Sequence, residues 1–393
     1  MSSRSLRVVV APDSFGGALD SVAVARAIAT GWSRVRSGDE LMTAPMADGG
    51  EGTLAAIAAA LGDRGERRTA AVHDPLGRPV AADWLLVDEG HGAFVEMAAA
   101  SGLARLAPAE RTTESALRSS TRGTGELIRA ALDAGVGQIT VGLGGSATTD
   151  GGAGMLVALG ARLLDDDGVA IAAGGAALAD VARVDVRGLD PRLAEVQLTI
   201  ACDVTNPLTG LMGAATVYAP QKGADAAAVA ELDAALVRWG TVISEATARD
   251  VAPVAGSGAA GGTTAALLGF TRATLRPGVE VVAELVHLAE MMATSDLVLT
   301  GEGRADEQTL SGKAAIGVAR LAPVGIPVVL LCGALGPGAA ALEEAGAFAL
   351  VQPIPDRPTD LGVAIADSQR LLENAAERLA RSIGIGLELG GGG

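Results

Sequence analysis

Five short polar loops, each rich in glycine and each placed after an apolar run, constrain the fold of this chain most strongly. Apolar runs that end in such a loop and continue into an apolar helix are typical of βα units, which build parallel sheets. Ligands bind beside the carboxyl ends of the strands in sheets of this kind. The pattern therefore predicts an α/β fold with a ligand site made of these loops. The loops lie at residues 12–17, 46–52, 142–152, 203–210 and 301–306.

The βα rhythm, meaning the regular alternation of expected strands and helices, is present at both ends of the chain and interrupted between them. Near residue 72 it gives way to a more β-rich region, and it returns near residue 290. The length of 393 residues also favours two domains. We expect a discontinuous α/β domain of residues 1–72 plus 290–393, with a second α/β domain, residues 73–289, inserted into it.

Charge and hydropathy exclude several classes of function. The net charge of −16 argues against a nucleic-acid partner, because phosphate backbones are bound by basic surfaces. The apolar runs are too short, or too interrupted by glycine and charge, to predict a membrane span. The opening MSSRSLRVVVAP leads directly into a strand, so we expect no signal peptide and a cytoplasmic location.

Lysine is scarce, and its two positions are informative. Of the 30 basic residues, all but Lys222 and Lys313 are arginine, and both lysines lie in glycine-containing polar loops. A compact ammonium acts as a point charge on phosphate where a planar guanidinium does not fit. Chance placement is the simpler alternative, but the chemistry of the surrounding loops favours a functional role.

The five loops together carry what phosphoryl transfer requires. Backbone N–H groups in glycine-rich turns bind anions, and acids that follow strands suit Mg²⁺. Any single loop has a simpler interpretation, in which the glycine ends one helix and the aspartate caps the start of the next. Five such loops in one chain favour a site that holds phosphates, a metal and a positioned nucleophile.

A nicotinamide-dependent dehydrogenase is the alternative. Gly142, Gly144 and Ala147 match the dinucleotide-binding pattern after an expected strand, with acids at 165–167. However, the first turn of such a domain leads directly into its helix, whereas SATTDGG intervenes here.

A series of motifs occurs in order along the chain: APDSFGGAL, PMADGGEG, TGELIRAAL, GLGGSATTDGGAGM, CDVTNPLTG, PQKGA, GAAGG and TGEGRADEQT with SGK. This series closely resembles the bacterial glycerate kinase family, of the glycerate 2-kinase type, over about residues 7–380. The resemblance implies ATP-dependent phosphorylation of D-glycerate to 2-phosphoglycerate with Mg²⁺. It also implies a discontinuous flavodoxin-like domain, an inserted domain resembling a restriction-endonuclease core, and an active site in the cleft between them.

The matching positions give the expected site. Catalytic roles are expected for Asp48, Asp203, Lys222, Glu302, Arg304, Asp306 and Lys313. Contacts with substrate or phosphate are expected for Asp13, Ser14, Gly49, Gly50, Glu51, Gly144, Gly145, Ser146, Asp150, Gly151, Asn206, Gln308 and Thr309. Metal ligands are expected among Asp203, Glu302 and Asp306.

Individual roles within this set stay open. The lysines would offset phosphate charge, and Arg304 would hold a phosphate or the glycerate carboxylate. The general base is expected among the four carboxylates Asp48, Asp203, Glu302 and Asp306, which are also the candidate metal ligands. For Asp203 a turn-forming role before Asn206-Pro207 is the simpler alternative. D-glycerate and ATP are the expected partners, with no nucleic acid and no membrane, and a homodimer is one open alternative.

One position departs from the family pattern. The first loop commonly reads APDSFKG in the family, and Gly16 stands here at the lysine position. Three interpretations of Gly16 are open. In the first, another cation, such as Arg304 or Arg122, compensates for the lysine; in the second, the lysine is dispensable in a subgroup of the family. In the third, the protein acts on a different hydroxy acid or has hardly any activity. A sugar-acid sensor without catalysis would bind glycerate and transfer no phosphate. The intact remaining motifs favour the first two alternatives.

Overall fold

The computed structural model describes residues 4–311 and 314–390, which form two compact units. Unit 1 contains the chain up to residue 48, residues 55–62 and the chain from residue 279; unit 2 contains residues 49–54 and 63–278. The α/β class expected from the sequence is confirmed. The units are described separately below.

The observed division differs from the expected boundaries at 72/73 and 289/290. A boundary at residue 72 would cut β3 (Glu66–His73), which pairs along its whole length with β4 (Pro79–Val87) of unit 2. At the other end, unit 1 already begins at residue 279, so most of α10 (Gly278–Leu285) belongs to it. The expected boundaries mark where the regular alternation of strands and helices changes along the sequence. The two units are instead defined by which residues pack together.

Unit 1 is built on a five-stranded parallel sheet with the order β13-β12-β11-β1-β2. From β1 the chain continues to β2 at one side, while β11, β12 and β13 extend the sheet on the other. The carboxyl end between β1 and β11 is therefore the topological switch point, where ligands bind in open α/β sheets. The strands are β1 (Arg7–Val10), β2 (Glu40–Thr43), β11 (Leu297–Ala305), β12 (Val328–Leu335) and β13 (Leu350–Pro353).

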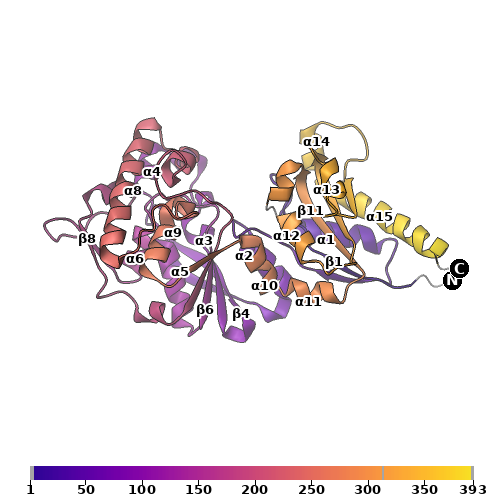
Figure 1. Ribbon diagram of the computed structural model, residues 1–393, viewed down its shortest axis with the longest axis horizontal. Coiled ribbons are helices and arrows are strands. Elements are labelled where there is room, and N and C mark those ends of the chain that lie inside the picture. The colour runs from indigo at the N-terminus through magenta and orange to yellow at the C-terminus, as the bar shows by residue number, and fades with distance from the viewer. Residues whose placement is uncertain (1–3, 312–313, 391–393) are drawn as a thin grey trace. The chain divides into compact units, whose positions relative to one another are not determined.

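Two long helices cover one face of this sheet (Figure 1). They are α1 (Ser21–Ser33) and α15 (Ser368–Gly390), and their apolar side chains share one core cluster with β1, β11 and β12. Close contact between them depends on Gly31, because a Cβ there would lie 2.0 Å from the carbonyl oxygen of Glu373. The core side chains include Val10, Trp32, Leu299, Leu331 and Leu372.

Unit 2 is built on a six-stranded mixed sheet with the order β10-β9-β6-β5-β4-β3. The four strands from β10 to β5 are parallel, and β4 and β3 are antiparallel additions at one edge. The parallel strands are β5 (Gly92–Glu96), β6 (Gln138–Gly142), β9 (Gln197–Ala201) and β10 (Thr274–Arg276); β7 (Arg162–Leu164) and β8 (Arg183–Asp185) form a separate pair.

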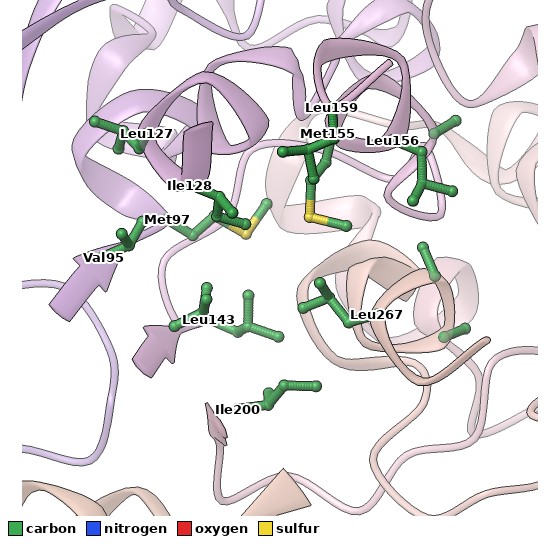
Figure 2. Packing of buried hydrophobic residues seen from close by; sticks show 14 of the residues in the cluster. Val95, Met97, Leu127, Ile128, Leu143, Met155, Leu156, Leu159, Ile200 and Leu267 are labelled. Atoms are coloured by element: carbon green, nitrogen blue, oxygen red, sulfur yellow. The ribbon is translucent and has the colours of Figure 1, made fainter. Parts of the chain in front are cut away.

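The core of unit 2 lies between this sheet and its helices (Figure 2). Ile128, Met155 and Leu267 contribute from three helices, and Val95 and Ile200 from two strands. Aliphatic side chains and methionine fill it almost entirely, as the low aromatic fraction of 2% requires.

The remaining helices complete the two units. No helix in residues 4–311 and 314–390 combines the length and apolar character needed to span a membrane. Unit 1 also contains α11 (Leu288–Ala293), α12 (Ala314–Leu321), α13 (Ala340–Glu344) and α14 (Leu361–Ala366), and α2 (Thr53–Leu61) crosses the division. Unit 2 contains α3 (Ala98–Ser101), α4 (Thr113–Arg118), α5 (Arg122–Asp133), α6 (Ala153–Ala158), α7 (Ala214–Tyr218), α8 (Ala226–Thr247) and α9 (Ala259–Phe270).

Candidate active site

In unit 1 the expected site residues gather at the switch point of the sheet. The loop after β1 is held against β11, since Asp13 N–H donates to the Gly301 carbonyl at 2.9 Å and the Thr300 hydroxyl donates to the Ala11 carbonyl at 2.8 Å. Glu302 lies in β11 itself and is buried. Asp13 and Glu302 are thus placed by neighbouring parallel strands.

The carboxylates of Asp13, Asp48 and Glu302 interact electrostatically within unit 1. The pKa of Asp13 is raised to about 6, chiefly by burial and also by the negative charges of Asp48 and Glu302, against the hydrogen bond from Ser14 N–H, which lowers it. Asp48 and Ser14 are exposed. Mutually repelling carboxylates at a sheet's carboxyl edge are suited to receiving a proton or facing a cation.

The turn after β11 forms an ordered frame around Glu302. The Thr309 hydroxyl donates to Glu302 Oε1 at 2.6 Å and accepts from Asp306 N–H at 3.1 Å. Asp306 in turn accepts from Gln308 N–H at 3.0 Å and pairs with Arg304 Nε at 3.0 Å. The side chain of Arg304 is 61% exposed, so its guanidinium is accessible from solvent. Lys313 lies outside the described residues.

In unit 2 the glycine-rich loop at residues 143–152 connects β6 to α6 and packs against residues 49–54. Gly144 N–H donates to the Gly49 carbonyl at 3.2 Å. A Cβ at Gly144 would lie 2.3 Å from the Cα of Gly50, so the two backbones meet only because side chains are absent. The structure thus brings together two glycine pairs that the sequence places far apart, Gly49–Gly50 and Gly144–Gly145.

Glu96 fixes residues 49–54 to unit 2, and the sequence interpretation missed it. Its carboxylate accepts from Gly52 N–H at 3.2 Å and from Leu54 N–H at 2.7 Å, at the start of α2. Burial raises the pKa of Glu96, although these two hydrogen bonds lower it. An acid closing the apolar run Gly92–Glu96 is the signal that could have identified it.

Lys222 supports the glycine-rich loop from inside the protein. Its side chain is among the large fully buried ones, and Nζ donates to Ser146 Oγ at 2.9 Å and to the Thr148 carbonyl at 2.5 Å. Burial lowers the pKa of Lys222 to about 7, against the negative charge of Asp150, which raises it. The contacts that the structure shows for this ammonium are with the loop itself.

Asp150 is enclosed in the same way. It accepts hydrogen bonds from the N–H groups of Thr121, Gly152 and Gly154, at 2.8 to 3.2 Å, and from the Thr121 hydroxyl at 2.9 Å. Burial raises the pKa of Asp150, against these hydrogen bonds. Asp150 therefore ties the loop to the start of α5 and to the first turn of α6.

The other expected residues of unit 2 lie on the loops after β2, β6 and β9. Asp203 is exposed and accepts from Gly278 N–H at 2.8 Å. The amide of Asn206 holds its own loop, donating to the Met212 carbonyl and accepting from the Tyr218 hydroxyl, both at 2.7 Å. Glu51 is exposed, and Gly151 accepts from the Trp239 indole at 2.9 Å.

The donor chemistry suits Mg²⁺ without forming a cage for it. Within residues 4–311 and 314–390, no three His, Cys, Asp or Glu side chains are arranged to hold a metal ion. Two of the three expected metal ligands, Glu302 and Asp306, belong to unit 1, and Asp203 belongs to unit 2. Mg²⁺ commonly takes only one or two carboxylates together with phosphate and water, so carboxylates at these loops fit the ion.

The dinucleotide-binding alternative does not match the local structure. After β6 the chain runs through the loop at residues 143–152, and α6 begins only at Ala153. A dinucleotide-binding turn places its helix directly after the glycines, so that the pyrophosphate meets the helix N-terminus. The pattern at Gly142, Gly144 and Ala147 therefore arises from close backbone packing.

Known proteins with similar sequences identify the family of this chain. A sequence profile of the glycerate kinase family matches residues 8–384. The glycerate kinase of Halalkalibacterium halodurans is 46% identical over 95% of this chain and 97% of its own length. The glycerate 2-kinase of Escherichia coli K12 is 42% identical over 98% of this chain and 100% of its own.

A solved structure is similar over almost the whole chain. The crystal structure of a putative glycerate kinase 2 from Salmonella typhimurium LT2 matches with a TM-score of 0.85 and 42% identity, covering 98% of this chain and 100% of that one. The motif series, the α/β fold and the full-length similarity lead to one conclusion: this chain belongs to the glycerate kinase family, a family of kinases.

Proposed function

We propose that this protein transfers the γ-phosphoryl group of ATP to the 2-hydroxyl of D-glycerate, forming 2-phosphoglycerate and ADP. The observation that carries this proposal is the full-length similarity to a relative named glycerate 2-kinase. The carboxylates at the switch point of unit 1 and the glycine-rich loop of unit 2 supply the chemistry that such a transfer requires.

The proposed step needs a proton acceptor beside the substrate. The 2-hydroxyl oxygen forms a bond to the γ-phosphorus, the bond to the ADP oxygen breaks, and the hydroxyl proton passes to a carboxylate. Asp48 and Asp306 remain alternatives for this acceptor. Asp13 joins them, because it is half-buried at the switch point while Glu302 beside it is already bonded to Thr309. A bound Mg²⁺ would neutralise phosphate charge, with Glu302 and Asp306 of unit 1 as its proposed ligands and Asp203 of unit 2 as an alternative.

Arg304 is the cation proposed to hold the substrate carboxylate or a phosphate. Its guanidinium is accessible and carries a planar set of donors that matches either group. Lys313 is proposed as a second cation. The glycine-rich loop at residues 143–152 offers backbone N–H groups to an anion.

A coupled assay of ADP release with D-glycerate tests the proposal, followed by NMR identification of the phosphoglycerate isomer. The expected result is ATP-dependent turnover that yields the 2-phosphate. Formation of the 3-phosphate would correct the position of transfer while leaving the kinase in place. Glycerate binding without phosphate transfer would instead support a binding protein that has lost catalysis.

A further inference from the structure

Glu96 lies at the carboxyl edge of the unit 2 sheet, beside the glycine-rich loop. It ends β5, and its register partner on the neighbouring parallel strand β6 is Gly142, from which the loop at residues 143–152 continues. The side chain of Glu96 is buried. A carboxylate is rarely buried unless hydrogen bonds compensate for its lost hydration. The groups that bind this carboxylate therefore indicate its role.

The carboxylate of Glu96 binds two backbone groups of residues 49–54. Each oxygen accepts a separate hydrogen bond, Oε1 from Gly52 N–H at 3.2 Å and Oε2 from Leu54 N–H at 2.7 Å. Leu54 is the second residue of α2, and the first N–H groups of a helix have no partner within it. Glu96 thus caps α2 from a different element, with its negative charge at the positive end of the helix.

The turn that leads into α2 is tight. Thr53 is buried, and its hydroxyl and its N–H both donate to the Gly50 carbonyl, at 2.7 Å and 3.2 Å. Gly49 has a left-handed φ of 90°, and a Cβ there would lie 2.6 Å from the carbonyl oxygen of Ala201 at the end of β9. The turn is therefore packed against unit 2 at its beginning and bound by a carboxylate at its end.

The position of this turn also determines the surroundings of the glycine-rich loop. The Gly49 carbonyl accepts from Gly144 N–H at 3.2 Å. A Cβ at Gly145 would lie 3.3 Å from the Cβ of Glu51 and 3.6 Å from its Oε2, so the Glu51 side chain lies beside the loop. These residues are among those expected to contact substrate or phosphate. A displacement of the turn would thus move a carboxylate and a backbone contact of the loop together.

The charge of Glu96 depends on these hydrogen bonds. The pKa of Glu96 is raised, chiefly by burial and also by the negative charge of Glu51, against the two N–H hydrogen bonds, which lower it. The neighbouring strand β4 carries one acid, Asp83, which pairs with Arg67 at 3.4 Å. The sequences of α2, α3 and residues 143–149 contain no ionisable side chain. Glu96 therefore takes up a proton more readily than an ordinary glutamate as the pH falls.

Protonation would weaken the hold of Glu96 on the turn. A proton converts one of the two carboxylate oxygens into a hydroxyl, and an uncharged oxygen is a weaker acceptor than a charged one. Both oxygens are in use, so at least one of the two N–H groups would lose its charged partner. The start of α2 and the turn before it would then be bound less tightly.

We propose that Glu96 is a positioning residue for the proposed reaction: its ionised carboxylate holds residues 49–51 against the glycine-rich loop, and protonation releases them. The inference rests on the proposed kinase function, because the loop that Glu96 aligns is the one proposed to bind an anion. Glu96 acts through the turn and touches neither substrate.

The test compares the full-length protein with Glu96→Gln, an uncharged isostere of the protonated side chain, from pH 8 to pH 5. At pH 8 the variant should have a kcat/KM for D-glycerate about tenfold lower, the usual scale for losing a hydrogen bond to a charged group. As the pH falls, the ratio of the two kcat/KM values should approach one, because both proteins then carry an uncharged side chain. The ratio cancels the titration of Asp13, which both proteins share.

Thermal unfolding separates positioning from a structural role. Because the pKa of Glu96 is raised, this group stabilises the folded protein in acid, and that contribution is lost as the pH rises through the raised pKa. Removing the charge at pH 8 should therefore leave Tm little changed. The control is Glu110→Gln, since Glu110 also accepts a backbone N–H, from Ala107 at 2.9 Å, but lies between α3 and α4. Its kcat/KM should equal that of the unmodified protein at every pH.

Hydrogen exchange of the amides of residues 49–54, measured by mass spectrometry, separates this inference from the function on which it rests. Exchange should be faster in Glu96→Gln than in the unmodified protein or the control. If the unmodified protein does not turn over D-glycerate, the kinase is rejected, while faster exchange in the variant upholds the anchoring by Glu96. Unchanged exchange would overturn the inference whether or not the protein is a kinase. With a working kinase, a kcat/KM ratio that does not change with pH, or a fall in activity matched by a fall in Tm, would also overturn it.

Discussion

At the scale of single residues, Lys222 shows that burial changes the role expected of a charged side chain. Its rarity in an arginine-rich chain predicts a role in phosphate binding, yet its ammonium is enclosed and donates to Ser146 and Thr148. A buried ammonium is retained only where its surroundings bind it, and here they belong to the loop expected to bind the anion. We therefore propose that Lys222 acts on ligands through the shape of the loop.

Lys222→Met is therefore expected to impair stability and activity together. Two oxygens would lose their donor, which should lower the free energy of unfolding by about 1–3 kcal/mol. The loss of loop geometry should also lower kcat/KM for D-glycerate. Urea unfolding and the coupled assay measure the two effects, and Ser146→Ala should change both less. A fall in kcat at unchanged stability would instead indicate direct action on phosphate.

A second question at the residue scale is whether Arg304 replaces the lysine expected at position 16. A Cβ at Gly303 would lie 3.3 Å from Gly16 N, so the loop after β1 runs beside the residues that precede Arg304. A Cβ at Gly16 meets nothing within 4 Å, and its backbone is not left-handed, so lysine fits there. We therefore propose that Arg304 supplies the cation that the family commonly has at position 16.

The two positions should compensate for one another. Arg304→Ala is expected to lower kcat/KM about tenfold to a hundredfold, as for loss of a charge-assisted contact. Gly16→Lys alone should change it by less than about threefold, but should recover part of the activity in the Arg304→Ala background. Arg7→Ala is the control, because Arg7 pairs with Glu40 at the amino end of β1. Failure of the double variant to recover would refute compensation by Arg304.

At the scale of elements, the strands and loops could largely be predicted from local pattern. Apolar runs followed by glycine and acid identified the loops after β1, β2, β6 and β9. The fifth expected loop, at residues 301–306, was wrong for residues 301–305, which continue β11 and pair with β12. The packing of residues 49–54 beside the loop at 143–152 could not be predicted, because contacts across such distances in sequence depend on the whole fold. For the same reason, the role of Glu96 and the burial of Lys222 could not be predicted. A single sequence shows how far apart residues lie along the chain, but not how deeply each is buried.

Gly144→Ala tests the packing of these two loops. The added Cβ would lie 2.3 Å from the Cα of Gly50, so one backbone must move. We expect kcat/KM to fall more than about tenfold and the protein to lose about 1–3 kcal/mol of stability, as for overpacking. Gly137→Ala, at the other end of β6, is the matched control, because its nearest contact would be an ordinary 3.9 Å. Equal behaviour of the two variants would show that the close approach is unimportant.

The segment that follows α1 carries a buried ion pair that should respond to acid. Asp39 accepts from Arg36, Trp32 Nε1 and Leu6 N–H, and the Arg36 and Asp39 side chains are 5% and 3% exposed. Burial opposes ionisation of Asp39, but these hydrogen bonds outweigh it and lower its pKa below 3.8. Its contribution is therefore complete above that pH and is lost as pH falls through the folded-state pKa.

Asp39→Asn should accordingly destabilise the protein at neutral pH and progressively less in acid. Loss of charge-assisted hydrogen bonds predicts about 1.5–3 kcal/mol at pH 7. Urea unfolding at pH values from 7 to 3 measures the difference between the variant and the unmodified protein, which should shrink below about pH 4. A difference that stays constant across this range would mean that the ionised carboxylate contributes nothing.

At the scale of the whole molecule, an acidic chain must bind anions. The net charge is −16 and the isoelectric point is about 4.7, so both proposed substrates approach a negative protein. Local cations such as Arg304, and the N–H groups of glycine-rich loops, attract anions and so oppose the negative electrostatic potential of the whole protein. Some of the acids are paired with arginine on the surface, as for Arg370 with Asp356 and Asp367.

The same charge should make stability depend on salt with a predictable sign. Like charges on the compact state repel one another, and salt screens them over a Debye length that falls from about 30 Å at 0.01 M to about 8 Å at 0.15 M. Thermal unfolding at pH 8 should therefore show Tm rising over this range of NaCl. Near pH 5, close to the isoelectric point, the rise should be much smaller because little net repulsion remains. A Tm that falls with salt at pH 8 would show that the surface ion pairs outweigh the repulsion between the excess acids.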